Sequence, residues 1–366
     1  MKLQVWFRWT KKNSYSISAL MPLIKAELSR EPRPGIMLYS FATIQAEEVY
    51  QEVSNAKVDA IYIAGGPHPS AAPEEVLEYF DYVVIGEGEA SLPKLIEALN
   101  GKEDPERVKG IAYKKNGKVR FTLPREPVDL DIYTPFRRPL LAPLEISRGC
   151  PWACAYCQTP RLFGDKMRHR SISMIAKYAR CHKDIRFTSP NSLAYGSNGL
   201  WPSLEKVELL LKTLSGLNKP IYFGTFPSEV RPEFISHQAL ELIVDYCSNK
   251  SLSIGAQSGS PRVLEAICRG HSVEQIELAC DLCSNHGLTP RVDLMFGLPT
   301  ETEEDQHLTI NLAKWIIQKG GKVRAHRFMP LPGTPLANTI PSPLDKQVEA
   351  KLGQMALEGN LTGNWS

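Results

Sequence analysis

The chain has 366 residues, of which 43% are hydrophobic and 23% are charged, and this length suggests roughly two domains. The composition is ordinary for a globular protein and excludes a disordered chain, a collagen-like repeat and a small disulfide-rich scaffold. The formal net charge of +3 is too small to argue for nucleic acid as a partner through bulk electrostatics.

The sequence carries no sign of export or membrane insertion. No apolar run reaches the roughly 18–20 residues that a membrane span needs. The first residues read directly as a strand and lack the zones of a signal peptide. We therefore expect a cytoplasmic chain without a membrane partner, in which cysteines are ligands or core residues rather than disulfides.

The first hundred residues alternate between strand-like and helix-like segments. We expect strands over 2–9, 35–41, 59–64 and 82–85, and helices over 16–29, 45–55, 73–80 and 91–99. This alternation predicts a parallel, doubly wound sheet of the Rossmann type, in which ligands bind at the carboxyl ends of the strands.

Two of these strand ends carry glycines. The loops after the third and fourth strands contain Gly65, Gly66, Pro67 and His68, and Gly86, Glu87 and Gly88. Glycine lets the backbone approach a large flat ligand closely. Taken alone, the same residues are more typical of tight strand-to-helix turns than of a ligand site.

A small hairpin over 110–122 closes this half, and a proline-rich stretch without periodicity follows. We therefore predict a first domain over residues 1–122 and an interdomain linker over 123–142.

A compact cysteine motif opens the second half. Cys150, Cys154 and Cys157 follow a strand near 143–148 with the spacing C-x3-C-x2-C. Three thiolates so close together can ligate three irons of a [4Fe–4S] cluster and leave the fourth iron open. Zinc is the alternative, but a structural zinc site needs a fourth ligand, and the nearest candidates, Cys181 and His182, are not at zinc-like spacing.

Further strands and helices alternate to the end of the chain. Strands are expected near 184–188, 220–225, 252–257, 289–295 and 322–328, with helices near 171–181, 203–215, 233–248, 273–286 and 303–319. With the strand before the cysteines they make six β/α units, which predicts a partial TIM-like barrel over 143–335 and a short tail over 336–366. Active sites of such barrels lie at the carboxyl ends of the strands.

The cysteine motif in this context resembles the signature of the radical S-adenosylmethionine (radical SAM) superfamily. The resemblance implies that AdoMet chelates the open iron and that the reduced cluster cleaves it to a 5′-deoxyadenosyl radical. Tyr156 matches the aromatic position whose backbone lies near the adenine. The other implied AdoMet contacts are polar residues near strand ends: Glu229, Gln257, Arg269 and Asp293. Taken singly, each of these is as typical of a surface or capping residue.

One segment departs from the family pattern. The second barrel strand is often followed by a Gly-Gly-Glu-like sequence that binds the amino group of AdoMet, but residues 188–192 read Thr-Ser-Pro-Asn-Ser. Backbone carbonyls or Asn191 could take that part.

A Rossmann-like domain before a radical SAM barrel resembles the cobalamin-binding, class B branch of the superfamily. This resemblance implies that both glycine-bearing loops lie against a corrinoid. The D-x-H-x-x-G motif that supplies a histidine to cobalt is absent. We therefore expect cobalamin to bind without a protein histidine on the cobalt. For His68, a capping role or a position in a solvated loop is more typical than ligation of the cobalt.

The resemblance implies a methyltransferase. One AdoMet would methylate cob(I)alamin, and a second would yield the radical that removes hydrogen from an unactivated sp3 carbon, which then takes the methyl group from methylcobalamin. The chain resembles archaeal B12-binding/radical SAM proteins, some of which methylate a glutamine of methyl-coenzyme M reductase. The expected partners are a protein or peptide substrate, with a small molecule as alternative, and an external electron donor in an anaerobic host.

Other functions remain open or are disfavoured. A cobalamin radical SAM enzyme for ring closure or rearrangement, and a non-catalytic cobalamin or redox sensor, are the alternatives. Methylthiotransferases need three more cysteines in the first domain, and none precedes Cys150. Cys268, Cys280 and Cys283 are interpreted as structural thiols rather than a second metal site.

Overall fold

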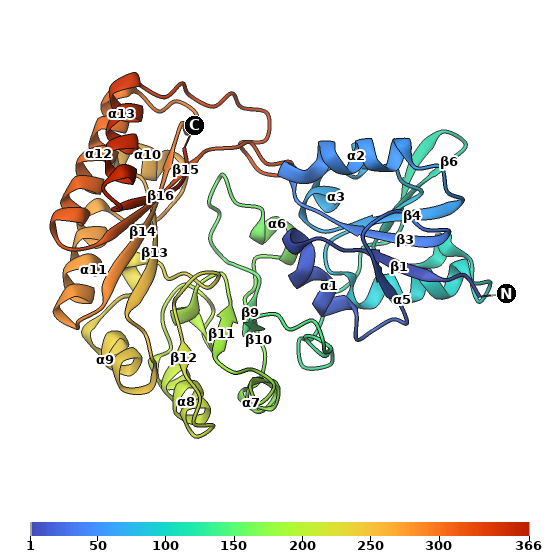
Figure 1. Ribbon diagram of the computed structural model, residues 1–366, viewed down its shortest axis with the longest axis horizontal. Helices are drawn as coiled ribbons and strands as arrows, with labels where there is room; N and C mark the ends of the chain where they lie inside the picture. The colour runs from blue at the N-terminus through green and yellow to red at the C-terminus, as the bar shows by residue number, and fades with distance from the viewer. Residues whose placement is uncertain (1, 366) are drawn as a thin grey trace. The chain divides into compact units, whose positions relative to one another are not determined.

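The computed structural model describes residues 2–365, which form two compact units (Figure 1). The first unit runs up to Ala142 and also takes in Arg161–Gly164 and Leu331–Gly333. The second comprises Pro143–Pro160, Asp165–Pro330 and Thr334–Ser366. The stretch 123–142, which we predicted as a linker, thus belongs to the first unit.

The first unit is built on a seven-stranded sheet with the order β2-β1-β3-β4-β5-β6-β7. Its strands are β1 (Val5–Arg8), β2 (Glu27–Ser29), β3 (Gly35–Ser40), β4 (Ala60–Gly65), β5 (Tyr82–Val84), β6 (Ile111–Lys115) and β7 (Lys118–Phe121). The first five pair in parallel, and β6 and β7 add the predicted hairpin in antiparallel pairing.

Helices cover both faces of this sheet, as Figure 1 shows. They are α1 (Ser14–Leu20), α2 (Ala46–Asn55), α3 (Pro67–Ala71), α4 (Pro73–Val76) and α5 (Gly88–Leu99). Successive residues of a strand point to opposite faces. Ile36 and Leu38 of β3 therefore join one core cluster, and Met37 and Tyr39 join the other.

One predicted helix is wrong in extent. We expected a helix over 16–29, but α1 ends at Leu20 and residues Glu27–Ser29 form the edge strand β2. Pro22 explains the difference, because a proline removes a backbone donor and disfavours helical geometry in the residue before it.

The second unit is an arc of parallel strands. β8 (Leu144–Glu145), β11 (Ile185–Thr188) and β12 (Ile221–Tyr222) form one sheet, and β13 (Ser251–Gln257), β14 (Thr289–Phe296), β15 (Lys322–Arg327) and β16 (Leu361–Asn364) form another. The arc continues across the two sheets, because Ser253 N–H donates to the carbonyl of Gly224 at 2.8 Å and Val230 bridges Ile254 in parallel. The predicted α/β fold class, with a partial barrel, is confirmed.

Helices follow the strands and cover the outer face of the arc, as Figure 1 shows for α9, α11, α12 and α13. They are α7 (Ile172–Ala179), α8 (Leu204–Ser215), α9 (His237–Tyr246), α10 (Pro261–Ala266), α11 (Val273–Asn285), α12 (Glu303–Gln318) and α13 (Lys346–Leu357). The stretch predicted as a short tail contains α13 and β16, and β16 extends the sheet by pairing with β15. Within residues 2–365, no helix is long and apolar enough to cross a membrane.

Candidate active site

The three cysteines lie in the loop between β9 (Ser147–Arg148) and α6 (Thr159–Phe163). Cys154 is buried, whereas Cys150 and Cys157 are partly exposed, and the N–H of Cys157 donates to the carbonyl of Cys154 at 3.1 Å. Burial raises the pKa of Cys150, and repulsion from the other two thiols acts in the same direction. Three neighbouring thiolates therefore need a cationic centre to hold them deprotonated.

The chemistry of this donor set fits a multi-iron cluster. In the part of the chain that the structure describes, no three or more His, Cys, Asp or Glu side chains are arranged to hold one metal ion. A [4Fe–4S] cluster makes a different demand, since each cysteine binds its own iron. Loop and donor set therefore suit the cluster that the spacing predicts.

Two buried arginines point at the middle cysteine. Arg269 Nη1 lies 3.5 Å from Cys154 Sγ, and Arg231 Nη1 lies 3.9 Å from the same sulfur. Arg231 directly follows Val230, which bridges β13, and Arg269 lies between α10 and α11. The cysteine loop therefore lies directly against the predicted AdoMet residue Arg269.

Three of the predicted AdoMet residues converge on Gly255 in β13. A Cβ placed on this glycine would lie 2.9 Å from Arg269 Nη2, 3.1 Å from Gln257 Nε2 and 3.5 Å from Glu229 Oε2. A register shift between Gly255 and Gln257 in the pairing with β14 re-aims this strand end. A side chain at Gly255 would clash with these polar groups, so the glycine lets them pack closely against the strand.

Asp293 joins this group through a residue that we did not predict. Arg324 of β15 donates from Nε to Asp293 Oδ1 at 2.6 Å and from Nη2 to Glu229 Oε1 at 2.5 Å. Burial raises the pKa of Glu229, and the nearby Asp293 acts in the same direction while Arg324 opposes it. One arginine thus bonds to two carboxyl groups, and its single positive charge can balance only one of them. The sequence signal that could have identified Arg324 is its position in the parallel pairing of β14 with β15, where it lies directly opposite Asp293.

Asn191 has the features of a residue that binds a ligand. It follows β11, it is 3% exposed, and neither its Nδ2 nor its Oδ1 has a hydrogen-bond partner. A buried polar group without a partner costs about 1–3 kcal/mol. An amide that both donates and accepts fits the amino and carboxylate groups of AdoMet.

Tyr156 lies at the edge of a small apolar cluster. Its partly buried ring packs against a group of buried side chains, namely Val263, Ile267, Leu298 and Phe328. This packing fixes the position of Tyr156, which directly precedes Cys157 in the chain. Its contact with the adenine, like the AdoMet contacts of the polar residues above, stays a prediction.

In the first unit, the loop after β4 is held tightly. Gly66, with φ of 98°, precedes Pro67, the first residue of α3. His68 is 3% exposed, with Tyr50 Oη 2.9 Å from its Nε2 and Thr43 Oγ1 3.2 Å from its Nδ1. The prediction that His68 lies in a solvated loop was therefore wrong. Burial lowers its pKa, and both ring nitrogens have protein partners.

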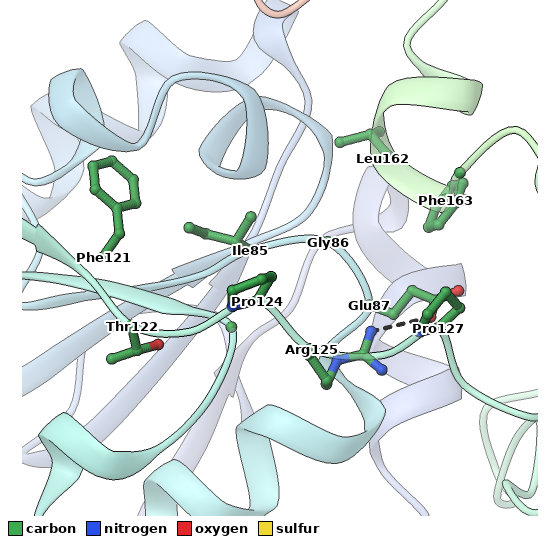
Figure 2. Close-up of a pocket in the computed structure, with 12 residues that line it drawn as sticks. Ile85, Gly86, Glu87, Phe121, Thr122, Pro124, Arg125, Pro127, Leu162 and Phe163 are labelled. Atoms are coloured by element: carbon green, nitrogen blue, oxygen red, sulfur yellow. Dashed lines mark hydrogen bonds and ion pairs between the residues drawn. The ribbon is translucent and has the colours of Figure 1, made fainter.

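The loop after β5 borders a pocket of about 400 Å³ within the first unit (Figure 2). Gly86 adopts φ of 70°, and Gly88 is the first residue of α5. Arg125 points toward Glu87, whose Oε2 accepts from Arg125 Nη2 at 3.0 Å and from the N–H of Val128 at 2.8 Å.

Apolar side chains complete the pocket, among them Phe121, Leu162 and Phe163. This volume lies in the range of small-molecule and cofactor sites. A mostly apolar pocket with one fixed ion pair and exposed glycine backbone fits part of a large cofactor such as cobalamin. The glycines after β4 are not among the residues that line it.

Comparison with known proteins assigns both units. The B12 binding domain family matches residues 27–96, and the Radical SAM superfamily matches residues 144–313. These two domain types take cobalamin, and a [4Fe–4S] cluster with AdoMet, which confirms the three predicted cofactors.

Curated relatives are distant and longer than this chain. An uncharacterized methyltransferase of Pyrococcus horikoshii is 26% identical over 303 residues, which cover 76% of this chain and 63% of the relative. The bacteriochlorophyllide d C-12(1)-methyltransferase of Chlorobaculum tepidum is 22% identical over 307 residues, covering 80% and 63%. The chain thus spans somewhat less than two thirds of these relatives' length.

Solved structures share the fold. TsrM from Kitasatospora setae, a radical S-adenosylmethionine methyltransferase with cobalamin and a [4Fe–4S] cluster bound, superposes with a TM-score of 0.73 at 16% identity, covering 92% of this chain and 77% of TsrM. The cobalamin-dependent S-adenosylmethionine radical enzyme OxsB superposes with a TM-score of 0.65 at 18% identity, covering 85% and 52%.

Proposed function

Because the chain belongs to the radical SAM superfamily and carries a B12-binding domain, we propose that it is a cobalamin-dependent radical SAM methyltransferase. It transfers a methyl group from AdoMet, with cobalamin as the carrier, to an unactivated sp3 carbon. The observation that carries this proposal is the cysteine loop lying against Arg269, within one unit that also gathers the strand-end polar groups around Gly255.

When bound, the cluster and AdoMet supply a carbon-centred radical, and cobalamin supplies the methyl group. The chain's own task is to bind and orient. The three thiolates would hold the cluster, Asn191 and Arg269 would bind the methionyl part of AdoMet, and Asp293 and Glu229 would bind the ribose. Because Gly255 has no side chain, Arg269 and Glu229 can approach β13 closely.

For the substrate we propose a protein residue, with a glutamine of methyl-coenzyme M reductase as the first candidate. Two similarities support this: the resemblance to archaeal B12-binding/radical SAM proteins, and relatives in Pyrococcus and Methanopyrus at 26% and 25% identity. The electron donor is external to the chain, and the reaction requires anaerobic conditions.

A small-molecule substrate is the second candidate. It is favoured by the relative named for its action on bacteriochlorophyllide d and by the similarity to TsrM, whose structure is also known with its tryptophan substrate. The two candidates differ in where the methyl group is found after reaction.

Anaerobic turnover tests the proposal. The reconstituted chain is incubated with AdoMet, cobalamin, a reductant and either a peptide containing the candidate glutamine or a small-molecule extract. We expect 5′-deoxyadenosine and S-adenosylhomocysteine together, and mass spectrometry locates the added methyl group. A matched sample without cobalamin should give no methylated product. Absence of 5′-deoxyadenosine contradicts radical catalysis, and deoxyadenosine without S-adenosylhomocysteine contradicts methyl transfer.

A further inference from the structure

Arg231 is a buried cation that the predicted site did not include. It lies between Val230, which bridges to β13, and the short 3-10 helix Pro232–Phe234, and it is 4% exposed. Its guanidinium lies 3.7 Å from the ring centroid of Trp152, and its Nη1 points at Cys154 Sγ. Arg231 therefore contacts the cysteine loop twice, once through an aromatic ring and once through a sulfur.

Trp152 is seated from several sides. Its Nε1 donates to the carbonyl of Gly199 at 2.9 Å. A Cβ on Gly270 would lie only 2.5 Å from Cζ3 of this ring, so the glycine leaves the space that the indole fills. Because Trp152 lies between Cys150 and Cys154 in the chain, its position fixes the path of the backbone that joins two of the three cysteines.

The barrel holds Arg231 rigidly. Its Nε donates to Glu233 Oε1, and its Nη2 donates to the carbonyl of Arg269. Glu233 Oε2 in turn lies 3.4 Å from Nδ1 of His271, whose Nε2 lies 3.1 Å from the carbonyl oxygen of Ala256. Hydrogen bonds to Glu233 and to the carbonyl of Arg269 therefore hold the guanidinium in addition to its contacts with the cysteine loop.

The charges at this point do not cancel within the protein. Arg231 and Arg269 both point at Cys154, and Glu233 offsets only one of them. A surplus of buried positive charge is unfavourable unless an anion accompanies it. A cluster with thiolate ligands is such an anion, and it becomes more negative when it gains one electron from an external donor.

We propose that Arg231 is a positioning residue for the iron–sulfur cluster: it clamps the cysteine loop through Trp152, and its fixed charge beside Cys154 favours the reduced cluster. Hydrogen bonds and charges next to the sulfur ligands set the reduction potential of such clusters. This role rests on the proposed function only in requiring a cluster at the three cysteines.

The test separates charge from stacking on the full-length, reconstituted chain without cobalamin or substrate. R231M removes the charge, R231K keeps the charge without the planar fork, and W152L removes the ring. For R231M we expect the reduced fraction at a fixed potential to fall about tenfold, a shift of about 59 mV to more negative potential. R231K should stay near the wild-type potential, whereas W152L should lose iron to a chelator several times faster at an unchanged potential.

Arg186 supplies a matched control. It also stacks on a ring, with 4.2 Å to the centroid of Tyr222, and pairs with Asp184 at 3.0 Å, but it is exposed at the surface of the same unit. R186M should leave the potential and the iron content unchanged. Midpoint potentials come from redox titration followed by electron paramagnetic resonance, and iron and sulfide are counted per chain.

If R231M keeps the wild-type midpoint potential, or if the potential shifts equally in R231M and R231K, the proposed role of the charge is overturned. If W152L loses iron to the chelator at the wild-type rate, the proposal that Arg231 clamps the cysteine loop through Trp152 is overturned. If R231M does not retain a cluster while its melting temperature is unchanged, the clamp is supported and R231K decides the charge. A wild-type chain that binds no cluster contradicts the proposed function instead, so the two failures are distinguishable.

Discussion

Asn191 stands out among the individual residues because both polar atoms of its buried amide lack a partner. We expect Asn191→Ala to weaken AdoMet binding by about tenfold, since one lost hydrogen-bonding group is worth about 1.4 kcal/mol. The same change removes an unsatisfied buried group, so the melting temperature without AdoMet should not fall. Anaerobic calorimetry of the cluster-loaded protein measures the binding. Asn285→Ala, at an exposed position of α11, is the control, and equal affinity of both variants would contradict the role.

Glu301 makes stability depend on pH at a single residue. Its Oε2 accepts from the N–H of Gly297 at 2.5 Å, its Oε1 is buried without a partner, and burial raises its pKa from 4.5 to about 7. Because the pKa of Glu301 is higher in the folded than in the unfolded chain, its protonated side chain contributes fully to stability below about pH 4.5. This contribution is lost as the pH rises through about 7.

Glu301→Gln removes this ionisation. The melting temperature of the variant relative to wild type should therefore increase between about pH 5 and about pH 8. Glu304→Gln, at an exposed position in the first turn of α12, should run parallel to wild type across the same range. A constant difference between Glu301→Gln and wild type would show that Glu301 does not titrate in this interval.

Charged side chains link strands β14 and β15 to the segment that pairs with β13. Arg324 of β15 pairs with Asp293 of β14 and with Glu229, whose neighbour Val230 bridges β13. The pKa of Glu229 is raised to about 8, so Arg324→Gln removes the cation that this carboxyl faces when it ionises, and we expect a loss of about 2 kcal/mol in unfolding free energy above that pH.

This loss should shrink as the pH falls through about 8, because protonation of Glu229 removes its repulsion from Asp293. Denaturant titration at about pH 9 and about pH 6 measures it. Arg291→Gln, at an exposed position of β14, should change the free energy of unfolding little. An equal loss at both pH values would mean that packing, and not charge, accounts for the effect.

Secondary structure was predictable where a local rule dominates. Alternating strands and helices indicated both units, but the expected helix over 16–29 ignored Pro22 and missed β2. The strand β16 was missed as well, because its short, glycine-containing sequence has no apolar pattern. It is a strand only because β15 offers a free edge, at which Val323 pairs with Leu361.

For the molecule as a whole, the two units are expected to load their cofactors separately. Gly86 has φ of 70° and lines the pocket of the first unit, so Gly86→Val both strains the backbone and fills the cavity. We expect this variant to bind several times less cobalamin per chain, by absorbance, while its iron and sulfide content stays at the wild-type level.

Gly101→Val is the matched control. Gly101 has a similarly positive φ of 86°, but no atom lies within 4 Å of an added Cβ. It should carry the same backbone strain and retain cobalamin. Equal cobalamin loss in both variants would assign the effect to strain, and parallel loss of the cluster in Gly86→Val would contradict separate loading.

The sequence by itself determined the cofactors and the order of the two units. Cluster ligation depends on three cysteines within eight residues, and a doubly wound sheet depends on local periodicity, so both are visible along the chain. Only the tertiary structure decided how the site is assembled. Arg231 meets Trp152, and Arg324 meets Glu229, across long stretches of sequence, because parallel strands bring their carboxyl ends to one edge. No local pattern records which side chains meet there.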